Sequence, residues 1–317
     1  MTINDIRIQP EASGLLLKSP YFSFRWYYAK HAICFETIET TKGETTAIPQ
    51  EIADEVKLLL FTDPETFERF SSYNYKAFRN LEVLQIPDGT TEISDYRFVC
   101  GGTFATVEIP ESVRRIGKNA FENQTALTHI IIPNGVESIG RSAFEGCRNL
   151  SSVTIAPSVT LIESFAFLDC PKLQDSKGMV LDKDKRWVLY AGDHLPATYQ
   201  LPPSVRHIAD NAFSGCHSLE ELILPEGLIS IGEEAFSFCG GLTHLDVPDS
   251  VTRIGYNAFF ELASVTYNGN APTFVKGDYD TRADDDEPLY DPLFGCAIVR
   301  TYVDNPNWGA ESLNCTK

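Results

Sequence analysis

The fold is decided by a segment that reads Cys147-Arg-Asn-Leu150-Ser-Ser-Val153-Thr-Ile155-Ala-Pro157-Ser-Val159-Thr-Leu-Ile162-Glu-Ser-Phe-Ala166-Phe167. Leu150, Val153 and Ile155 have the LxxLxL spacing, in which the last two side chains lie on the same face of a short strand. Further along, Val159 and Ile162 turn a second apolar patch inward. The pair Ala166-Phe167 then supplies one small and one large core side chain. The segment therefore encodes one coil with two buried edges.

This pattern recurs with a fixed period. An apolar residue, followed by Pro in all coils but one, marks each coil at Ile86, Ile109, Ile132, Ile155, Leu201, Leu224 and Val247. Successive markers lie 23, 23, 23, 46, 23 and 23 residues apart. A period of this length predicts a solenoid, because each repeat can bury its apolar face only against its neighbours. We expect a mostly β solenoid with a second set of short strands and short helical or 3₁₀ turns.

Three other positions follow the same period. The Phe of the Ala-Phe pair predicts a stacked spine through Phe121, Phe144, Phe167, Phe213, Phe236 and Phe259. Three residues after it, Cys recurs at Cys147, Cys170, Cys216 and Cys239. We interpret these as small buried hydrophobes, not disulfides or zinc ligands, because equivalent rungs point the same way and no CxxC pair occurs. Glycines that follow the second patch, at Gly117, Gly140, Gly232 and Gly255, predict bends with positive φ.

The period divides the chain into three parts. Residues 1–76 are expected to form an N-terminal cap or small α+β domain, 77–269 the solenoid, and 270–317 an acidic loop and C-terminal cap. In the first part the pattern predicts strands at 3–8, 21–28 and 33–40, and helices at 52–61 and 64–70. In the 46-residue step, two apolar runs flank a polar turn, which predicts a β-hairpin insert at about 175–200.

Two segments outside the regular coils are candidate sites. At the hairpin, Lys185, Arg186 and Trp187 make a distinctive surface in an acidic chain, although a structural variant of one coil is the simpler interpretation. The segment 277–291 is rich in Asp and Glu, which can gather Ca²⁺. Its ligand order differs from that of an EF-hand, so we favour a solvated loop.

Composition narrows the partners. The chain has 44 acidic and 26 basic residues and a formal charge of −18, which argues against nucleic acid and acidic membranes. Its longest apolar stretches are strand-sized, so no membrane insertion is expected. The first residues, 1–7, lack the basic and apolar regions of a secretion signal. We therefore expect either an intracellular protein or one whose signal lies outside this sequence.

No catalytic constellation is apparent. Nucleophilic or metal-dependent catalysis needs clustered Ser, Cys, His and carboxylates, and no GxGxxG, P-loop, HExxH or GxSxG context occurs. His129 and His244 occupy the same outward position five periods apart, which is roughly 24 Å at the strand spacing. That separation is too large for a shared metal. We expect no enzyme activity, cofactor or metal site.

The outward strand positions are then the candidate binding residues. This concave face is small, polar and acidic, with isolated isoleucines and no aromatic residue. The face suits a protein ligand, bound by a monomer. The candidate contacts are Glu108, His129, Ile131, Thr154, Glu221, Ile223, His244 and Asp246.

The stretch from Leu127 to Leu150 combines the Ile-Pro, Gly-Val, Ile-Gly, Ala-Phe and Cys-x-x-Leu phases. In this combination it resembles the BspA-like class of leucine-rich repeats, over Ala77 to about Gly269. Members are often bacterial cell-surface proteins implicated in adhesion to host matrix proteins or other cells. The resemblance implies a secreted or cell-surface adhesin-like protein that binds and does not catalyse. An intracellular scaffold for a protein partner and a structural spacer are the alternatives.

Overall fold

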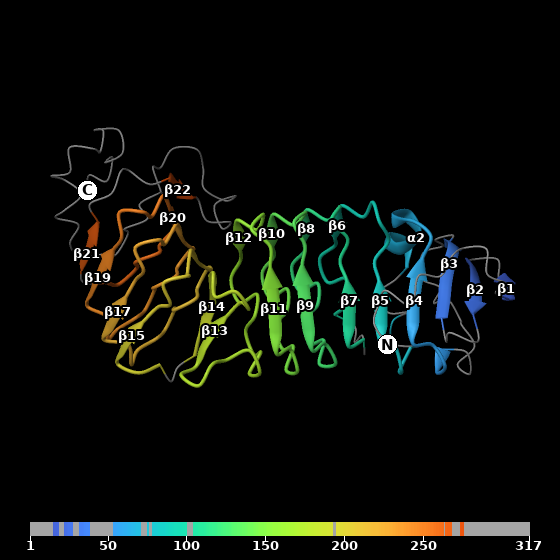
Figure 1. Cartoon of the computed structure of the whole chain (residues 1–317), viewed down its shortest axis with the longest axis horizontal. Helices are drawn as coiled ribbons and strands as arrows, with labels where there is room; N and C mark the ends of the chain where they lie inside the picture. The colour runs from blue at the N-terminus through green and yellow to red at the C-terminus, as the bar shows by residue number, and fades with distance from the viewer. Residues whose placement is uncertain are drawn as a thin grey trace, which may run out of the picture.

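The computed structural model describes residues 15–18, 22–27, 32–38, 53–70, 75, 78–99, 104–192, 195–262, 264–267 and 273–275. These residues form an elongated stack of coils whose strands run across the long axis (Figure 1). The coils follow one another in chain order, from β1 (Leu15–Lys18) at one end to β21 (Ser264–Tyr267) and β22 (Thr273–Val275) at the other. The predicted mostly β solenoid is confirmed.

Each coil contributes one front strand, formed by the LxxLxL residues. The front strands are β4 (Leu58–Phe61), β5 (Val83–Gln85), β7 (Thr106–Glu108), β9 (His129–Ile132), β11 (Ser152–Ile155), β15 (Thr198–Gln200), β17 (Glu221–Ile223), β19 (His244–Val247) and β21. Equivalent residues of neighbouring coils pair in parallel, as Ser152 does with His129. Burial alternates along each strand: in β9, Ile130 and Ile132 are buried, whereas His129 and Ile131 are exposed. The outward side chains form what we call the front face.

The predicted second set of strands is also present. These strands are β6 (Glu92–Ile93), β8 (Arg115–Ile116), β10 (Ser138–Ile139), β12 (Leu161–Ile162), β16 (His207–Ile208), β18 (Ser230–Ile231), β20 (Arg253–Gly255) and β22. They stack in parallel, with Ile139 paired to Ile116 and Ile162. Hydrogen-bonded turns follow the strands from β6 to β20, as where the Ala143 N–H donates to the Gly140 carbonyl at 3.2 Å. The described repeats contain no regular helix, and each of these coils closes through hydrogen-bonded turns.

The core is a column of identical positions. The ring centroids of Phe121 and Phe144 lie 5.0 Å apart at an interplanar angle of 3°, and those of Phe144 and Phe167 lie 5.1 Å apart. The stack resumes after the hairpin with Phe213 and Phe236 at 5.1 Å. These distances confirm the predicted spine. At this spacing each ring has a van der Waals partner in the next coil.

The predicted cysteine ladder is confirmed as well. The four repeat cysteines, Cys147, Cys170, Cys216 and Cys239, are free and buried. Each thiol donates to a backbone carbonyl of the preceding coil, as from Cys147 to Phe121 and from Cys170 to Phe144, both at 3.2 Å. Cys100, Cys296 and Cys315 lie outside the described residues.

The prediction that the repeat glycines adopt positive φ is wrong. Gly117, Gly140, Gly232 and Gly255 are not in that region, and the left-handed positions of the coil fall to Asn119, Ser142, Asn211 and their equivalents. The glycines are needed for close approach. A Cβ on Gly140 would lie 2.8 Å from the Gly117 backbone, and one on Gly232 would lie 2.5 Å from Ala209.

The N-terminal part extends the front sheet. β1, β2 (Phe22–Tyr27) and β3 (Ala32–Ile38) pair antiparallel, and β3 then pairs parallel with β4. The predicted strands at 21–28 and 33–40 are confirmed, and the one at 3–8 lies outside the described residues. The prediction of a helix over 52–61 is wrong for Leu58–Phe61, which is β4. Pairing between β3 and β5 buries this apolar run as a strand despite its helical spacing.

The short helix that follows β4 is confirmed as α2 (Pro64–Arg69). Asp63 is its N-cap, and its Oδ1 accepts from the Thr66 N–H at 2.8 Å. Hydrogen bonding by the Thr66 backbone keeps the pKa of Asp63 below its usual value, with the Thr62 and Thr66 hydroxyls adding to the effect and burial opposing it. Phe67 of α2 packs edge-on against Phe61 of β4 at 5.3 Å, so the helix covers the first coil.

The predicted hairpin is confirmed as β13 (Met179–Leu181) and β14 (Trp187–Ala191). Its turn is built on Asp182, whose Oδ1 accepts from the backbone N–H groups of Arg186 and Trp187 at 2.7 and 2.8 Å. β14 then pairs parallel with β16. The hairpin therefore enters the stack of second strands and replaces one coil.

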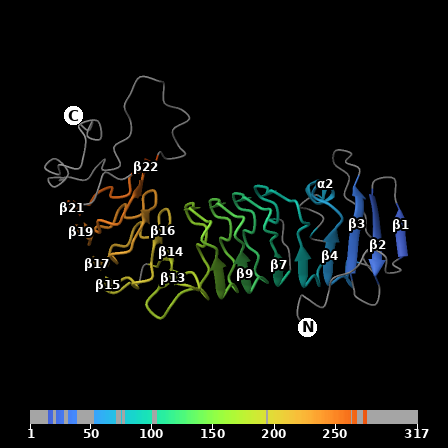
Figure 2. The ribbon, with the colours of Figure 1, turned by 45° about the horizontal axis from the view of Figure 1, so that its top comes forward.

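The hairpin divides that stack into two ladders, β6–β8–β10–β12 and β14–β16–β18–β20–β22. Figure 2 shows the coils after the hairpin inclined to those before it. Two bonds tie the ladders: the Asp210 N–H donates to the Ile162 carbonyl at 3.1 Å, and the Arg253 guanidinium donates to the Thr160 carbonyl at 3.0 Å. We call this junction the crease.

The stacked phenyl rings of the spine lead to a first prediction, about stability. Phe144→Ala is expected to lower the free energy of unfolding by about 3–5 kcal/mol, because Phe144 is fully buried and leaves a cavity between two stacked rings. His129→Ala, an exposed residue of the neighbouring front strand, is the control and is expected to change stability little. Urea denaturation followed by circular dichroism measures both, and equal midpoints would contradict the assigned phase.

The glycines make a second prediction. Gly140→Ala is expected to destabilise the protein by about 1–3 kcal/mol, because its Cβ would overlap the backbone of the preceding coil. Gly240→Ala is the matched control, since a Cβ there meets only a His217 ring nitrogen at 3.8 Å. Thermal melting of the two variants is the measurement. A loss at Gly240 as large as at Gly140 would show that helix or turn propensity, and not close approach, sets the requirement.

Candidate functional site

The front face carries all eight of the outward residues that the sequence suggests as contacts. Glu108 and Thr154 are half-buried, and the other six are exposed: His129, Ile131, Glu221, Ile223, His244 and Asp246. Ile131 is 61% exposed, more than any other large hydrophobic side chain that the structure describes. Ile223, four repeats later at the same position, is 43% exposed. The front face is thus polar at these positions except for the two exposed isoleucines, Ile131 and Ile223.

A groove of about 780 Å³ gathers some of these residues. It lies across β4, β5, β7 and β9, and it contains Glu108, His129 and Ile131. It sits where the front sheet divides, because β7 ends one hydrogen-bonded sheet and β9 begins the next. Thr154, Glu221, Ile223, His244 and Asp246 are not among its lining residues. The structure therefore separates the predicted contacts into a groove set and an open set.

The groove has an apolar bed and an acidic rim. Leu58, Val83, Val107 and Ile109 contribute apolar surface from successive front strands. Asp88 and Glu111, one period apart after the coil-marking prolines, join Glu108 as carboxylates. Among the described residues that line the groove, none is Lys or Arg. Sequence analysis missed Asp88 and Glu111, although their shared repeat phase was a signal that could have found them.

The open set is held by contacts within the face. The Nε2 of His244 lies 3.0 Å from Asp246 Oδ1, and its Nδ1 lies 2.7 Å from the Ser264 hydroxyl. Thr266 adds a further hydroxyl 3.2 Å from Nε2. Glu221 and Ile223 lie on β17, paired to Thr198 and Gln200. Around β19, therefore, outward side chains bond to one another.

The hairpin differs from its predicted surface. Lys185 is exposed at the turn and Arg186 is half-buried. Trp187, however, is 4% exposed and stacks on His207 with ring centroids 4.5 Å apart. Placing Trp187 on the surface was wrong, because β14 enters the stack and turns this side chain toward β16. Of these three candidate residues, Lys185 and Arg186 remain available to a partner.

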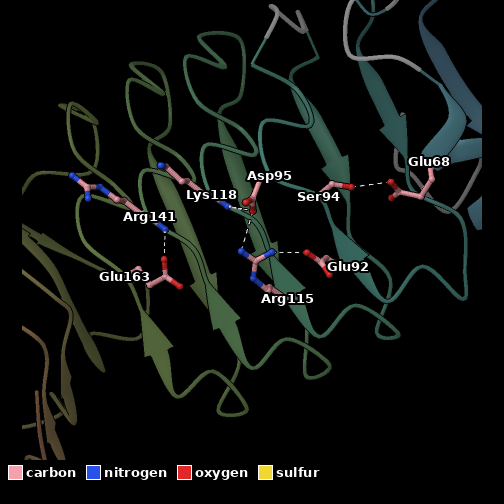
Figure 3. Close-up of polar contacts among 8 residues, drawn as sticks. All are labelled: Glu68, Glu92, Ser94, Asp95, Arg115, Lys118, Arg141 and Glu163. Atoms are coloured by element: carbon pink, nitrogen blue, oxygen red, sulfur yellow. Dashed lines mark hydrogen bonds and ion pairs between the residues drawn. The ribbon is translucent and has the colours of Figure 1, made fainter. Parts of the chain in front are cut away.

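A charged row follows the second strands of the N-terminal half (Figure 3). The Arg115 guanidinium bridges Glu92 and Asp95 on the coil before it. The carboxylate of Asp95 also accepts from the Lys118 N–H at 2.8 Å, and that of Glu163 accepts from the Arg141 N–H at 2.8 Å. Further along the same row, the Ser94 hydroxyl donates to Glu68. These side chains satisfy one another and the backbone, so they tie coils together.

The crease holds a second polar cluster, around a cavity of about 90 Å³. Asp210 is 9% exposed and its Oδ1 accepts from the Glu233 N–H at 2.7 Å. Burial raises the pKa of Asp210 to about 7; the Glu233 and Glu163 carboxylates add to the rise, while the Glu233 N–H and Arg253 oppose it. No sequence signal pointed to this cluster, because it joins coils on both sides of the hairpin.

His207 contacts two residues that line this cavity: it stacks on Trp187, and its Nδ1 lies 2.9 Å from the Ser230 hydroxyl. Burial lowers the pKa of His207 to about 4, and the charges of Arg186, Arg206 and Arg253 lower it further. The ring is therefore neutral near neutral pH. It packs as an aromatic and hydrogen-bonding side chain.

The described residues give little support to metal or thiol catalysis. No group of three or more His, Cys, Asp or Glu side chains suited to a metal occurs in this part of the chain. Burial raises the pKa of the Cys170 and Cys239 thiols to about 12 and raises that of Cys147 as well. A thiol with a raised pKa is a poor nucleophile. The acidic segment 277–291 lies outside the described residues. No helix in the described residues is long and apolar enough to cross a membrane.

The repeated coil, its front sheet and its exposed face define a leucine-rich repeat scaffold of the kind that serves protein interaction. The model of the BspA type leucine rich repeat region matches this chain in six copies, over residues 46–174 and 195–275. The chain belongs to this family. No curated protein sequence matches it.

Three solved structures resemble the chain. A leucine-rich repeat protein from Eubacterium ventriosum is 16% identical over 80% of this chain and 73% of that one, with a TM-score of 0.37. The pneumococcal vaccine antigen PcpA is 17% identical over 83% and 84%, with a TM-score of 0.32. A leucine rich cell surface protein from Faecalibacterium prausnitzii is 16% identical over 81% and 96%, with a TM-score of 0.30.

The buried Asp210 and His207 at the crease predict how the stability of the protein depends on pH. Unfolded Asp210 releases its proton near the ordinary aspartate pKa of 3.8, whereas the folded group holds it to about pH 7, so its contribution to stability falls as pH rises through this window. His207 acts oppositely: its contribution falls as pH drops from 6.5 to about 4. Asp210→Asn is therefore expected to stabilise the protein at pH 7 and to lose this advantage toward pH 4.

Thermal melting of wild type and Asp210→Asn across that pH range is the measurement. Asp95→Asn is the control, since Asp95 occupies the same repeat position 115 residues earlier and accepts the equivalent hydrogen bond at an exposed site. A constant offset between wild type and Asp210→Asn at every pH would contradict the assignment.

Proposed function

We propose that this chain is a non-catalytic protein-binding module whose front face, and first of all its groove, contacts the partner. The single observation that carries the proposal is Ile131, a large aliphatic side chain that is 61% exposed inside a groove of about 780 Å³ on the front face. Exposed apolar side chains set in a concave, polar-rimmed surface are typical of interaction sites.

The size and composition of the surface support this function. The front strands stack at about 4.8 Å per coil, so the face extends far enough for an interface of ordinary protein–protein size. Its core-facing residues are separate from its outward ones, so outward substitutions can change binding without changing packing. The absence of aromatic residues from the eight candidate positions favours modest affinity, because aromatic side chains supply much of the energy at interface centres.

The finer proposal is an adhesin-like role at the cell surface. We infer it from the family, whose members are often bacterial surface proteins that bind host matrix proteins or other cells. The excess of carboxylates, with a net charge of −18, suits a partner with basic surfaces and disfavours direct contact with anionic lipids or nucleic acid. A secreted form would serve the same binding.

The test uses a matched pair of substitutions. Ile131→Asn and Ile223→Asn make the same change at the same repeat position, one inside the groove and one outside it. Immobilised fibronectin, laminin and collagen are the probes, with surface plasmon resonance as the readout. We expect wild type to bind at least one of them, Ile131→Asn to weaken that binding by about tenfold, and Ile223→Asn to retain it.

Each other result has a meaning. Binding that neither substitution affects, but that Lys185→Ala with Arg186→Ala abolishes, would move the site to the hairpin. No binding to any matrix protein would contradict the adhesin role and favour the scaffold alternative. Surface location is tested separately, by labelling intact producing cells with an antibody to this chain beside a cytosolic control protein.

A further inference from the structure

We propose that the groove receives an extended, basic segment of its protein partner, with Lys or Arg side chains close to an aliphatic residue that packs on Ile131. This inference rests on the proposed function and adds to it the chemistry of the bound segment. Its basis is the arrangement of charge around the one strongly exposed aliphatic side chain among the described residues of the groove.

The carboxylates lie on one side of Ile131, on the two coils that precede its strand. Glu108 is one repeat before Ile131 at the same outward position, so it occupies the adjacent strand of the front face, about one strand spacing away. Gln85 continues this row and pairs with Glu108 in register. Asp88 and Glu111 form a second row, just beyond the ends of β5 and β7. Two short rows of polar and acidic side chains therefore stand beside Ile131 and among the apolar lining residues.

The basic residue nearest in sequence to Asp88 and Glu111 binds backbone carbonyl groups and leaves the negative charge of these two side chains in place. This residue is Arg114, and its Nη1 donates to the backbone carbonyls of Glu111 and Gly135 at 2.9 and 3.1 Å. It is exposed and bonds to neutral carbonyl groups. His129 also lines the groove, and its Nδ1 lies 3.2 Å from the Thr128 hydroxyl. The carboxylates of the groove therefore favour a cationic ligand.

Other occupants fit less well. A phosphate backbone or an acidic peptide would bring like charge to the carboxylates of Asp88, Glu108 and Glu111. A purely apolar segment would cover Ile131 but would partly desolvate the carboxylates of Asp88 and Glu111. A basic segment satisfies both features, and the field of a chain with net charge −18 would speed its association.

The experiment selects ligands without prior choice of partner. Random peptides displayed on phage are panned on the wild-type chain, and the recovered clones are sequenced and their affinities measured by fluorescence polarisation. We expect enrichment of Lys and Arg close to Leu, Ile or Val. Binding of these peptides is expected to weaken by about tenfold when monovalent salt rises from low to high, because exposed charge pairs are screened.

Two variants with equal loss of charge locate the site. The groove variant carries Asp88→Asn, Glu108→Gln and Glu111→Gln, and the control carries Glu220→Gln, Glu226→Gln and Asp249→Asn, which are exposed residues of the later coils outside the groove lining. We expect the selected peptides to bind the groove variant about tenfold more weakly and the control within about twofold of wild type. Equal melting temperatures establish that both are folded.

The outcomes separate this inference from the proposed function. Recovered peptides without basic enrichment, binding insensitive to salt, or equal loss in both variants would each overturn the basic segment. Recovery of no groove-dependent peptide would do the same. If a matrix protein binds in an Ile131-dependent way while the charge variant binds it normally, the proposed function stands and the inference falls. If the peptides behave as expected but Ile131→Asn has no effect on matrix binding, the groove is a peptide site and the adhesin proposal falls.

Discussion

The structure depends on the close approach of each coil to the one before it. Where a second strand is followed or ended by Gly117, Gly140, Gly232 or Gly255, the backbone passes so near its neighbour that a Cβ on Gly140 would lie 2.8 Å from it. This approach sets the distance at which the phenyl rings of Phe121, Phe144 and Phe167 stack, and at which each repeat thiol reaches a carbonyl of the previous coil. Because every coil makes the same contacts, one set of residue choices repeated at a fixed period stabilises the whole stack.

The hairpin shows what happens when one coil departs from that set. Tyr190 lies midway in sequence between Phe167 and Phe213, where the Phe of the Ala-Phe pair would be. Leu189 and Tyr190 stand there, and the chain forms β13 and β14 in place of a regular coil. Continuity is kept by Trp187 on His207 and by bonds that cross the crease. The cost is a small cavity beside a buried acid and an imidazole, groups that are stable there only because each has a hydrogen-bond partner.

The front face is the part of the repeat that packing leaves open. In β9 alternate residues are committed to the core, and the residues between them, His129 and Ile131, are available for contacts. Inward and outward side chains alternate along each front strand. The outward residues can therefore differ from coil to coil while the buried residues stay the same. This chain uses that freedom unevenly: acid and aliphatic groups gather in the groove, whereas around β19 the outward residues bond to one another.

The sequence by itself determined the coil, its core and its outward positions. Those features depend on nearest neighbours in a regular stack, so the period of 23 is enough to place Phe144, Cys147 and Ile131. The tertiary structure decided the rest. The glycines serve close approach, Leu58–Phe61 is a strand, and Trp187 is buried, because each is set by a neighbour that local pattern does not reveal. Likewise the groove needs β4 beside β5 and a divided front sheet, and the crease joins Thr160 to Arg253, 93 residues apart. Contacts of that range follow from how irregular segments pack, and periodicity carries no information about them.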